Sequence, residues 1–459
     1  MPESKRLRRV LIANRGEIAV RLVRGCAEVG AESVAVVSEA DRESMVARLA
    51  TRTVCIGPSP ARDSYLRPDL IVHAALATGC DAIHPGYGFL SEQPSLAELC
   101  DENGLVFVGP TAETIRMLGN KLEARRLAER ADVPLLPGSA RVSDAEEAAR
   151  FAAEMGYPIL VKAAAGGGGR GMKVVHTPSE LAGTLQTTAS EARSAFGDAT
   201  LYLERFIADA RHIEVQVLGD GKGQVVHLGD RDCSLQRRHQ KVIEEAPASD
   251  IPEDVRRDMH DAAVRIARQV NYASAGTVEF LFDRSANAFY FLEMNTRLQV
   301  EHPVTEMVTG IDLVAAQLRI AGGEPLSIPE DIGPNGHSIE ARITAESPEN
   351  AFRPSPGRIR RWQAPDMDGL RVDTYAEAGA LIPPFYDSMV AKFIVHGPDR
   401  QTAIDKMRRA LEAFEVEGIS TNRAFLLRLL GEPAFAAMRH NTRSIDAFLA
   451  ADAAAESNA

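Results

Sequence analysis

Short apolar runs alternate with helical spacings along the N-terminal part of the chain. Residues 10–13 predict a buried strand and residues 14–16 a turn. Ile18, Leu22 and Cys26 then recur at every fourth position, which gives a helix one apolar face. Further apolar runs follow at 33–38, 81–84 and 105–108. This alternation is typical of a parallel α/β sheet, so we predict a Rossmann-like domain.

The polarity pattern changes after this region. A helix is predicted from about Thr111 to Ala131, where Thr111 can cap the first amides and Gly119 is an internal weak point. Strands of alternating polarity then extend from about residue 156 to 330. The clearest strand, at 212–217, carries three polar side chains on one face, which we expect to line a cleft.

A polar segment rich in glycine and proline at 331–336 indicates a linker. Beyond it, the pattern predicts a third region of strands and a closing helix near 401–414. The tail after Ala450 is dominated by alanine and acidic residues. We therefore predict a disordered tail at 451–459.

Composition limits the classes of protein that fit this pattern. The 459 residues suggest several domains, and 45% apolar with 25% charged residues is typical of a folded, soluble chain. No apolar run approaches the roughly 20 residues of a membrane span, and a net charge of -12 disfavours general binding to nucleic acid. The five cysteines lack metal-binding or redox spacing, and the N-terminus lacks an export signal, so we expect a cytoplasmic protein.

A strand, a glycine loop and a second strand follow one another around Lys162. The loop contains Gly166, Gly167, Gly168 and Gly169, whose bare amides can bind phosphate oxygens while Lys162 meets a phosphate charge. A flexible surface hairpin explains this segment equally well when it is taken alone. No helix follows, and neither a dinucleotide fingerprint nor the Lys-Ser or Lys-Thr end of a P-loop is present, so a mobile lid fits better.

Polar residues occupy every odd position from Glu293 to Glu301. If this segment is extended, these side chains share one face, which we expect to be a reaction surface. Glu279 lies upstream in an apolar strand, where a carboxylate is costly unless a cation or hydrogen bonds compensate it. With Glu293 and Asn295 it offers the hard oxygen ligands that Mg2+ prefers beside nucleotide phosphates. An amphipathic hairpin with a solvated face is the alternative.

Five basic or potentially basic groups lie in the run 231–241 of this acidic protein. Taken alone, such a run is usually a solvated loop. Beside a nucleotide site, it can supply the positive charge that two anions need in order to meet in one cavity.

Together these segments resemble the biotin carboxylase family of ATP-grasp enzymes, which are subunits or domains of acetyl-CoA, propionyl-CoA and pyruvate carboxylases. The resemblance spans nearly the whole chain and includes motifs at 12–19, 84–92, 301–306, 340–343 and 384–389. It implies a mixed α/β and α+β fold: a Rossmann-like N-terminal domain, a central ATP-grasp domain with a mobile glycine-rich lid, and a C-terminal biotin carboxylase domain. The implied boundaries are 1–119, 120–330 with the lid at about 137–208, and 331–450.

The resemblance assigns roles by motif position. ATP would contact Lys121, Lys162, Gly166, Gly167, Gly168, Gly169, Glu204, His212, Gln236, His239, Glu279 and Glu293. Mg2+ or Mn2+ would bind Glu279, Glu293 and Asn295. Bicarbonate would contact Lys241, Arg297, Gln299, Glu301 and the backbone of Val300, and biotin would contact Tyr87 and Arg342. The catalytic residues would be Glu301, Arg297, Arg342 and Lys241.

The implied reaction has two steps. Glu301 would deprotonate bicarbonate, which attacks the γ-phosphate of ATP to give carboxyphosphate and ADP. Carboxyphosphate would release CO2 and phosphate under the closed lid, and the phosphate would take the N1′ proton of biotin. Arg342 would stabilise the resulting enolate oxygen.

Three residues depart from the pattern of the family. Ala164 and Ala165 replace the usual serine and glycine of the lid, which we expect to alter lid dynamics, and Thr344 replaces a common asparagine.

The resemblance also implies partners. Biotin would arrive as a substrate on a separate biotin carboxyl carrier protein, and a carboxyltransferase subunit would complete an acyl-CoA carboxylase. Acetyl-CoA, and hence fatty acid biosynthesis, is the first expectation, although the sequence does not identify the final acceptor. Arg24 and Glu28 would lie at a homodimer contact, with an ion pair within their helix as the alternative.

Two other functions compete with this interpretation. Another ATP-grasp carboxylate ligase would hydrolyse ATP in response to a different acid and would ignore biotin. A nucleotide-sensing or scaffold subunit would retain the fold without the chemistry. The intact Lys241, Glu279, Glu293, Arg297 and Glu301 count against this second alternative.

The chain contains no Met-Lys-Met segment, the usual surround of a biotinylated lysine. We therefore predict that this chain is not itself biotinylated. Mass spectrometry of the intact chain, produced together with a biotin ligase, should give the unmodified mass. A mass increase from biotin on any of its lysines would contradict a separate carrier.

Overall fold

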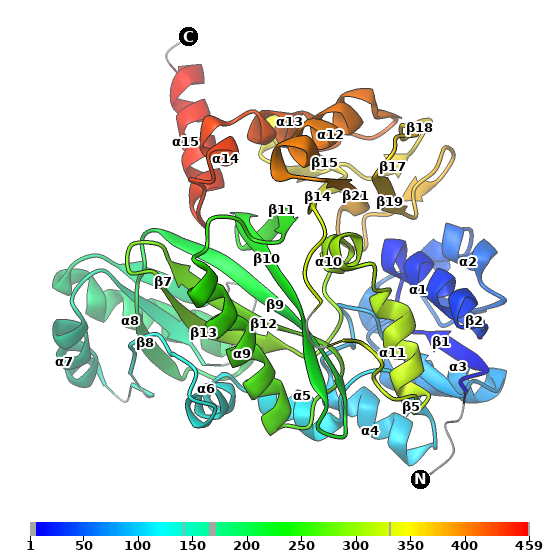
Figure 1. Ribbon diagram of the computed structural model, residues 1–459, viewed down its shortest axis with the longest axis horizontal. Helices are drawn as coiled ribbons and strands as arrows, with labels where there is room; N and C mark the ends of the chain where they lie inside the picture. The colour runs from blue at the N-terminus through cyan, green and yellow to red at the C-terminus, as the bar shows by residue number, and fades with distance from the viewer. Residues whose placement is uncertain (1–5, 140, 143, 165–170, 330–331, 458–459) are drawn as a thin grey trace.

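Three larger sheets organise the chain in this computed structural model, which describes residues 6–139, 141–142, 144–164, 171–329 and 332–457 (Figure 1). A five-stranded sheet forms the N-terminal domain, a three-stranded sheet forms a lobe at the opposite side, and an eight-stranded sheet connects the centre to the C-terminal region. Among the described residues, no helix is long and apolar enough to cross a membrane.

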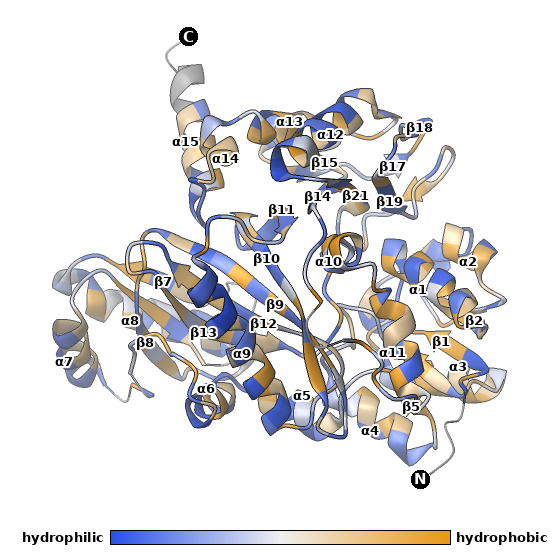
Figure 2. Ribbon diagram, in the orientation of Figure 1, coloured by the Kyte–Doolittle hydropathy of each residue, from blue (hydrophilic) through white to orange (hydrophobic). Residues whose placement is uncertain are grey.

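The N-terminal domain contains a parallel sheet, as the apolar runs predict. Its strand order is β3-β2-β1-β4-β5, and all four pairings are parallel. The strands are β1 (Arg9–Ile12), β2 (Glu32–Val37), β3 (Arg52–Cys55), β4 (Ala82–His84) and β5 (Val106–Phe107). The helices are α1 (Gly16–Glu28), α2 (Met45–Leu49), α3 (Pro68–Thr78) and α4 (Pro94–Glu102). The interior strand β1 is largely orange in Figure 2, whereas the edge strand β3 is mostly exposed and has no apolar run that could have predicted it.

The single helix predicted from Thr111 to Ala131 is wrong, because two helices occupy this segment. They are α5 (Ala112–Gly119) and α6 (Lys121–Arg130). Thr111 caps the first through the amide of Thr114, as predicted. Asn120 has an extended backbone, and its side chain accepts hydrogen bonds from the amides of Leu122 and Glu123. An asparagine that caps a new helix ends the old one, so Lys121 becomes the first residue of α6.

The lobe has its own small apolar core. Its elements are α7 (Ala145–Met155), β6 (Ile159–Ala163), β7 (Met172–Val175), α8 (Pro178–Phe196) and β8 (Leu201–Arg205). Ile159 and Val161 of β6 meet Leu201 and Leu203 of β8 in this core, which forms a separate cluster. The two strands predicted around Lys162 are therefore confirmed as β6 and β7. The glycines Gly166–Gly169 lie outside the described residues, and lid motion stays a prediction.

The eight-stranded sheet is antiparallel throughout and has the order β13-β12-β9-β10-β11-β14-β21-β19. Its strands are β9 (Ala210–Asp220), β10 (Val225–Arg237), β11 (Gln240–Ala246), β12 (Ala273–Asp283), β13 (Ala288–Asn295), β14 (His337–Thr344), β19 (Leu370–Thr374) and β21 (Met389–Gly397). The nearby helices are α9 (Glu253–Gln269), α10 (His302–Thr309) and α11 (Leu313–Ala321). Strand β11 pairs with β14 through Ile243 and Ala341. The sheet is thus continuous across the predicted boundary at 330/331, which a linker pattern does not reveal.

The C-terminal region surrounds the far end of this sheet. Its remaining strands are β15 (Glu346–Ser347), β16 (Arg353–Pro354), β17 (Gly357–Arg358), β18 (Arg361–Gln363), β20 (Leu381–Ile382) and β22 (Glu415–Glu417). Its helices are α12 (Arg400–Ala413), α13 (Arg423–Leu430), α14 (Pro433–Ala436) and α15 (Ser444–Ser457). The prediction of a disordered tail is wrong for residues 451–457, which continue α15, because alanine has the highest helix propensity.

A buried ion pair in the N-terminal domain provides a test of this fold. Arg15 Nε donates to Asp41 at 2.7 Å, the Tyr65 hydroxyl donates to the same carboxylate at 2.6 Å, and both charged side chains are buried. We predict that Arg15→Met lowers the free energy of unfolding by about 3–5 kcal/mol, since it leaves a buried carboxylate without its cation.

Urea denaturation measures this loss. Arg62→Met is the control, because the pair of Arg62 with Asp63 is exposed and such pairs contribute less than about 1 kcal/mol. Equal stability of the two variants would contradict a structural role for the Arg15 pair.

Candidate active site

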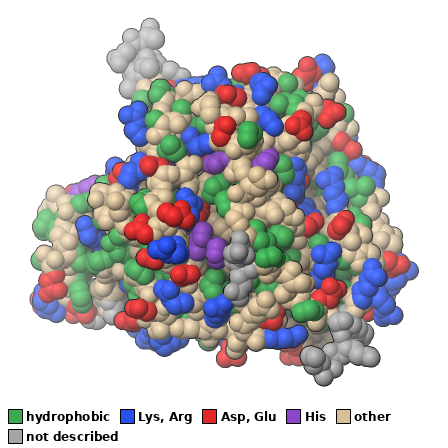
Figure 3. Space-filling view, viewed as in Figure 1, with side chains coloured by type: hydrophobic (Ala, Val, Ile, Leu, Met, Phe, Trp, Pro, Cys, Tyr) green, Lys and Arg blue, Asp and Glu red, His purple; other side chains and the backbone are tan. Residues whose placement is uncertain are grey.

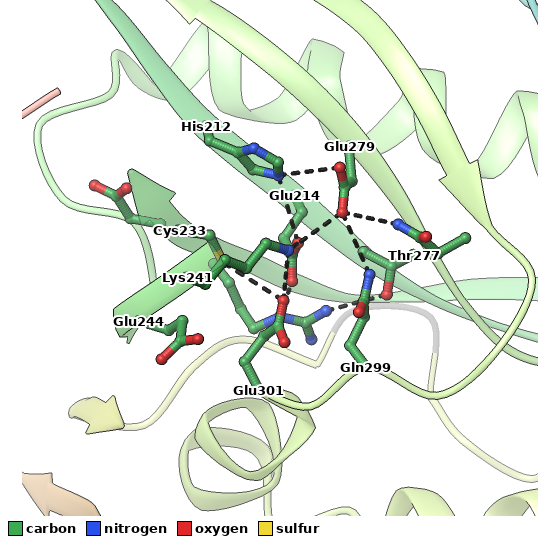
Figure 4. Close-up of polar contacts among 12 residues, drawn as sticks. His212, Glu214, Cys233, Lys241, Glu244, Thr277, Glu279, Gln299 and Glu301 are labelled. Carbon is green, nitrogen blue, oxygen red and sulfur yellow. Dashed lines mark hydrogen bonds and ion pairs between the residues drawn. The ribbon is translucent and has the colours of Figure 1, made fainter. Parts of the chain in front are cut away.

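The centre of the site is the ammonium group of Lys241, at the start of β11. Its Nζ donates to Glu214 Oε2 at 2.5 Å, to Glu301 Oε1 at 2.5 Å and to Glu279 Oε1 at 3.2 Å. Figure 4 shows the ammonium between these carboxylates, which reach it from different segments. Burial opposes the charge of Lys241, but the carboxylates outweigh it and hold the pKa of Lys241 well above its usual value.

Strand alternation positions one side of this cluster. In β9, Ile213, Val215 and Val217 join an apolar core with α6 and α9. His212, Glu214 and Gln216 therefore point to the opposite face, as the sequence predicts. That face is not wet, however: Glu214 and Gln216 are fully buried. In the register of the sheet, Glu279 lies opposite Glu214 on one side and opposite Glu293 on the other.

The basic run 231–241 contributes less positive charge than we expected. It forms strands β10 and β11 rather than a loop. Arg231 is fully buried and donates to Glu214 at 2.5 Å, while Arg237 pairs with Glu346 at 3.0 Å. Arg238 and His239 are exposed at the tip of the hairpin. Of the basic groups in this run, Lys241 and Arg231 contact the carboxylates of the cluster, whereas the others pair elsewhere or lie in solvent.

The segment 293–301 converges as predicted but has a different conformation. Strand β13 ends at Asn295, and the chain then bends and turns into α10. The side-chain amide groups of Asn295 and Gln299 nevertheless donate to Glu279 Oε1 at 2.8 Å and 3.3 Å, respectively. Arg297 donates to Gln299 Oε1 at 2.8 Å. The prediction of one extended strand through Glu301 is therefore wrong.

The N-terminal domain and the C-terminal region each add a charged group. Glu92 accepts from Arg297 Nε at 2.9 Å and from the amide of Thr296 at 3.2 Å. From β14, Arg342 donates to Glu301 Oε2 at 2.9 Å and to Glu244 Oε1 at 2.6 Å. Three regions of the chain therefore meet at one group of side chains.

Sequence reasoning gave no role to Glu92, Glu214 or Glu244. For two of these residues, the sequence contains a pattern that could have indicated a role in the site. Glu92 closes the motif at 84–92, and Glu214 lies between two polar residues on the predicted polar face of 212–217. Glu244 follows two apolar residues in β11 and has no such signal, since its partner Arg342 is distant in sequence.

The residues predicted to bind ATP fall into several groups. Lys162 Nζ donates to Glu204 Oε2 at 2.8 Å, and Arg125 donates to the other oxygen of Glu204 at 2.6 Å. Lys121 Nζ lies 3.8 Å from Glu293 Oε2. Burial lowers the pKa of Lys121, despite the opposing charge of Glu293.

The remaining predicted site residues differ in their surroundings. His212 Nε2 lies 3.3 Å from Glu279 Oε2, and His212 Nδ1 lies 3.1 Å from the side-chain amide nitrogen of Gln236. Tyr87 is half-buried, 5.9 Å from the Lys392 ammonium to the ring centre. His239 is exposed, apart from the group around Lys241. Arg24 and Glu28 are both exposed on α1, and among the described contacts no ion pair joins them.

The oxygen ligands predicted for a divalent metal are chemically suitable. Glu279 and Glu293 face each other across β12 and β13. Burial, followed by the charge of Glu279, raises the pKa of Glu293. Two facing carboxylates beside an asparagine oxygen are a donor set that Mg2+ or Mn2+ accepts, and the metal would relieve their repulsion.

Two tighter groups also have the composition of a metal site. They are His212, Glu214 and Glu279, and Glu214, Cys233 and Glu301. Lys241 already binds all three of the carboxylates in these two groups. We therefore assign both groups to the cluster of carboxylates around Lys241 rather than to a metal site. On the face drawn in Figure 3, acidic and basic side chains are interspersed.

The fold and the site together define an ATP-grasp ligase. Three family models match: "Biotin carboxylase, N-terminal domain" over residues 6–115, "Carbamoyl-phosphate synthase L chain, ATP binding domain" over 120–329, and "Biotin carboxylase C-terminal domain" over 340–447. The chain belongs to the biotin carboxylase family. It is an ATP-dependent biotin carboxylase, a ligase.

Individual relatives support this membership over nearly the full length. The chain is 49% identical to a biotin carboxylase of Bacillus subtilis, covering 96% of the chain and 99% of the relative. It is 52% identical to that of Pseudomonas aeruginosa, covering 94% and 96%. A biotin carboxylase of Campylobacter jejuni, solved as a beta-gamma-ATP complex, matches with a TM-score of 0.93 and 44% identity, covering 96% and 98%. The biotin carboxylase domain dimer of Hydrogenobacter thermophilus 2-oxoglutarate carboxylase, solved with MgADP, ADP and bicarbonate, matches with a TM-score of 0.92 and 45% identity, covering 96% and 98%.

Proposed function

We propose that this chain carboxylates the biotin of a separate carrier protein, as the first half-reaction of an acetyl-CoA carboxylase. The observation that carries the proposal is the convergence of Lys241, Arg297, Glu301 and Arg342 beside the facing carboxylates of β12 and β13. These groups offer cations and hydrogen-bond donors for a small anion next to a place for metal and nucleotide. Similar proteins are named both as a biotin carboxylase and as a subunit of pyruvate carboxylase, so acetyl-CoA as the final acceptor is the more specific part of the proposal.

In the first step, Glu301 acts as the base. Burial and the charge of Glu214 oppose its ionisation, but Lys241, Arg342 and Arg231 outweigh them and lower the pKa of the Glu301 carboxyl. Glu301 is then a carboxylate at neutral pH and takes the proton of bicarbonate. Arg297, Gln299 and the backbone of Val300 orient the bicarbonate oxygen toward the γ-phosphorus of ATP. The P–O bond to ADP breaks as the new bond forms, and carboxyphosphate results.

The nucleotide lies between two groups of residues in this proposal. The residues that contact ATP are Lys121, Lys162, Gly166–Gly169, Glu204, His212, Gln236 and His239. Glu279, Glu293 and Asn295 hold Mg2+ or Mn2+. When bound, the metal neutralises charge on the transferring phosphoryl group. Lys241 remains the protein cation between the two anions.

In the second step, Arg342 and Tyr87 hold the ureido ring of biotin. Carboxyphosphate yields CO2 and phosphate, and the phosphate takes the N1′ proton. Arg342 stabilises the enolate oxygen while N1′ bonds to CO2.

A carrier protein delivers the biotin, and a carboxyltransferase subunit passes the carboxyl group to acetyl-CoA. Two copies of the chain form a dimer that includes α1 with Arg24 and Glu28. The dimer of the 2-oxoglutarate carboxylase relative supports this assembly.

Phosphate release from ATP tests the proposal when bicarbonate and free biotin are each omitted in turn. The wild-type chain should require bicarbonate and respond to biotin. Arg297→Ala should lower this rate by about a hundredfold or more, because it removes a donor to the reacting anion.

Arg62→Ala is the matched control, since the Arg62 side chain is exposed and pairs only with the adjacent Asp63 among its described contacts. Its rate should equal that of the wild type. Turnover by the wild type that ignores biotin would contradict biotin carboxylation, and full activity of Arg297→Ala would contradict the proposed bicarbonate site.

A further inference from the structure

Lys392, on β21, contacts the backbone of the active-site turn rather than the reacting groups. Its side chain is fully buried, although it carries an ammonium group. Its Nζ donates to the carbonyl oxygen of Val300 at 2.7 Å. This bond joins the C-terminal part of the sheet to the turn that carries Gln299 and Glu301. The mechanism above gives Lys392 no role.

The backbone of this turn has left the sheet, so its carbonyl groups need other hydrogen-bond partners. The carbonyl of Gln299 bonds to the His302 ring at 2.8 Å, and the carbonyl of Glu301 accepts from the amide of Val304 at 3.2 Å. Both contacts lie within the segment itself. The carbonyl between them, that of Val300, is the one held by a side chain from another region of the fold.

The surroundings of Lys392 leave its ammonium directed at this carbonyl. In the sheet, Lys392 lies between Arg342 on β14 and Asp373 on β19. Asp373 already binds Arg371 at 2.7 Å. Glu17, the nearest carboxylate among the described ion pairs of Lys392, is farther away, at 3.5 Å. A buried ammonium requires polar partners, and the shortest bond that it makes here is to the backbone of the turn.

We propose that Lys392 is a positioning residue for bicarbonate: it fixes the Val300–Glu301 peptide, and with it the Val300 backbone and the Glu301 carboxylate. The inference rests on the proposed function, in which bicarbonate binds at this turn. Loss of the bond releases the turn but leaves Lys121, Lys162 and Glu204 in place. The effect therefore falls on bicarbonate rather than on ATP.

Steady-state kinetics of Lys392→Met test this inference. The KM for bicarbonate should rise about tenfold or more, the effect of losing one charge-assisted hydrogen bond, while the KM for ATP stays within about twofold. Lys406→Met is the matched control, because Lys406 donates to the carbonyl of His396 at 2.9 Å in the same region, away from the site. Its KM for bicarbonate should equal that of the wild type.

A second variant covers the case in which Lys392→Met fails to fold. Burial raises the pKa of Glu17 to about 7, with Lys392 opposing the shift, so removal of the lysine leaves Glu17 uncompensated. The double variant Lys392→Met/Glu17→Gln removes both charges and should show the same selective rise. Equal changes in both KM values, or none, in the folded double variant would overturn the inference. A wild-type chain whose ATP hydrolysis does not need bicarbonate would instead overturn the proposed function.

Discussion

A single buried ammonium holds three carboxylates together at the centre of this molecule. Glu214, Glu279 and Glu301 repel one another, and each is costly to bury; Lys241 is the cation that contacts all three, while two arginines each pair with one of them. The carboxylates come from β9, from β12 and from the turn after β13. Lys241 thus ties the conformation of the turn to the sheet. Because charge is concentrated in a buried place, the same groups interact strongly with any anion or metal that enters.

The continuous antiparallel sheet is what allows such a cluster to form. Strand β14 places Arg342 next to β11, so that a residue from the C-terminal region reaches Glu301. The N-terminal domain adds Glu92, which holds Arg297. A site made from three regions has no precise geometry until all of them are docked. This explains why support residues such as Glu244 and Lys392 lie far in sequence from the groups that they hold.

The sequence predicts the parts of this structure that depend on local patterns. Apolar alternation identified the N-terminal sheet, and period-two polarity identified the face of β9 that carries His212 and Glu214. Both follow from the direction of side chains along one element. The polar residues from Glu293 to Glu301 were likewise recognised as a group. Their roles in binding came from family resemblance and remain proposals.

What the sequence could not predict depends on contacts between distant segments. The pairing of β11 with β14 has no local signal, and neither has the pairing that neutralises Arg231. The bend after Asn295 was missed because an alternating pattern does not show where a strand leaves its sheet. Asn120 was a weak local signal: an asparagine is neutral enough within a helix to be overlooked, yet it caps the next one.

The most direct test of this account is the rate of bicarbonate-dependent phosphate release by Lys241→Met. Lys222→Met is the control, because Lys222 is exposed in the turn between β9 and β10. The account predicts that Lys241→Met loses about a hundredfold or more of the rate, while the control is unchanged. A Lys241→Met rate close to that of the wild type would contradict the central role of the buried ammonium.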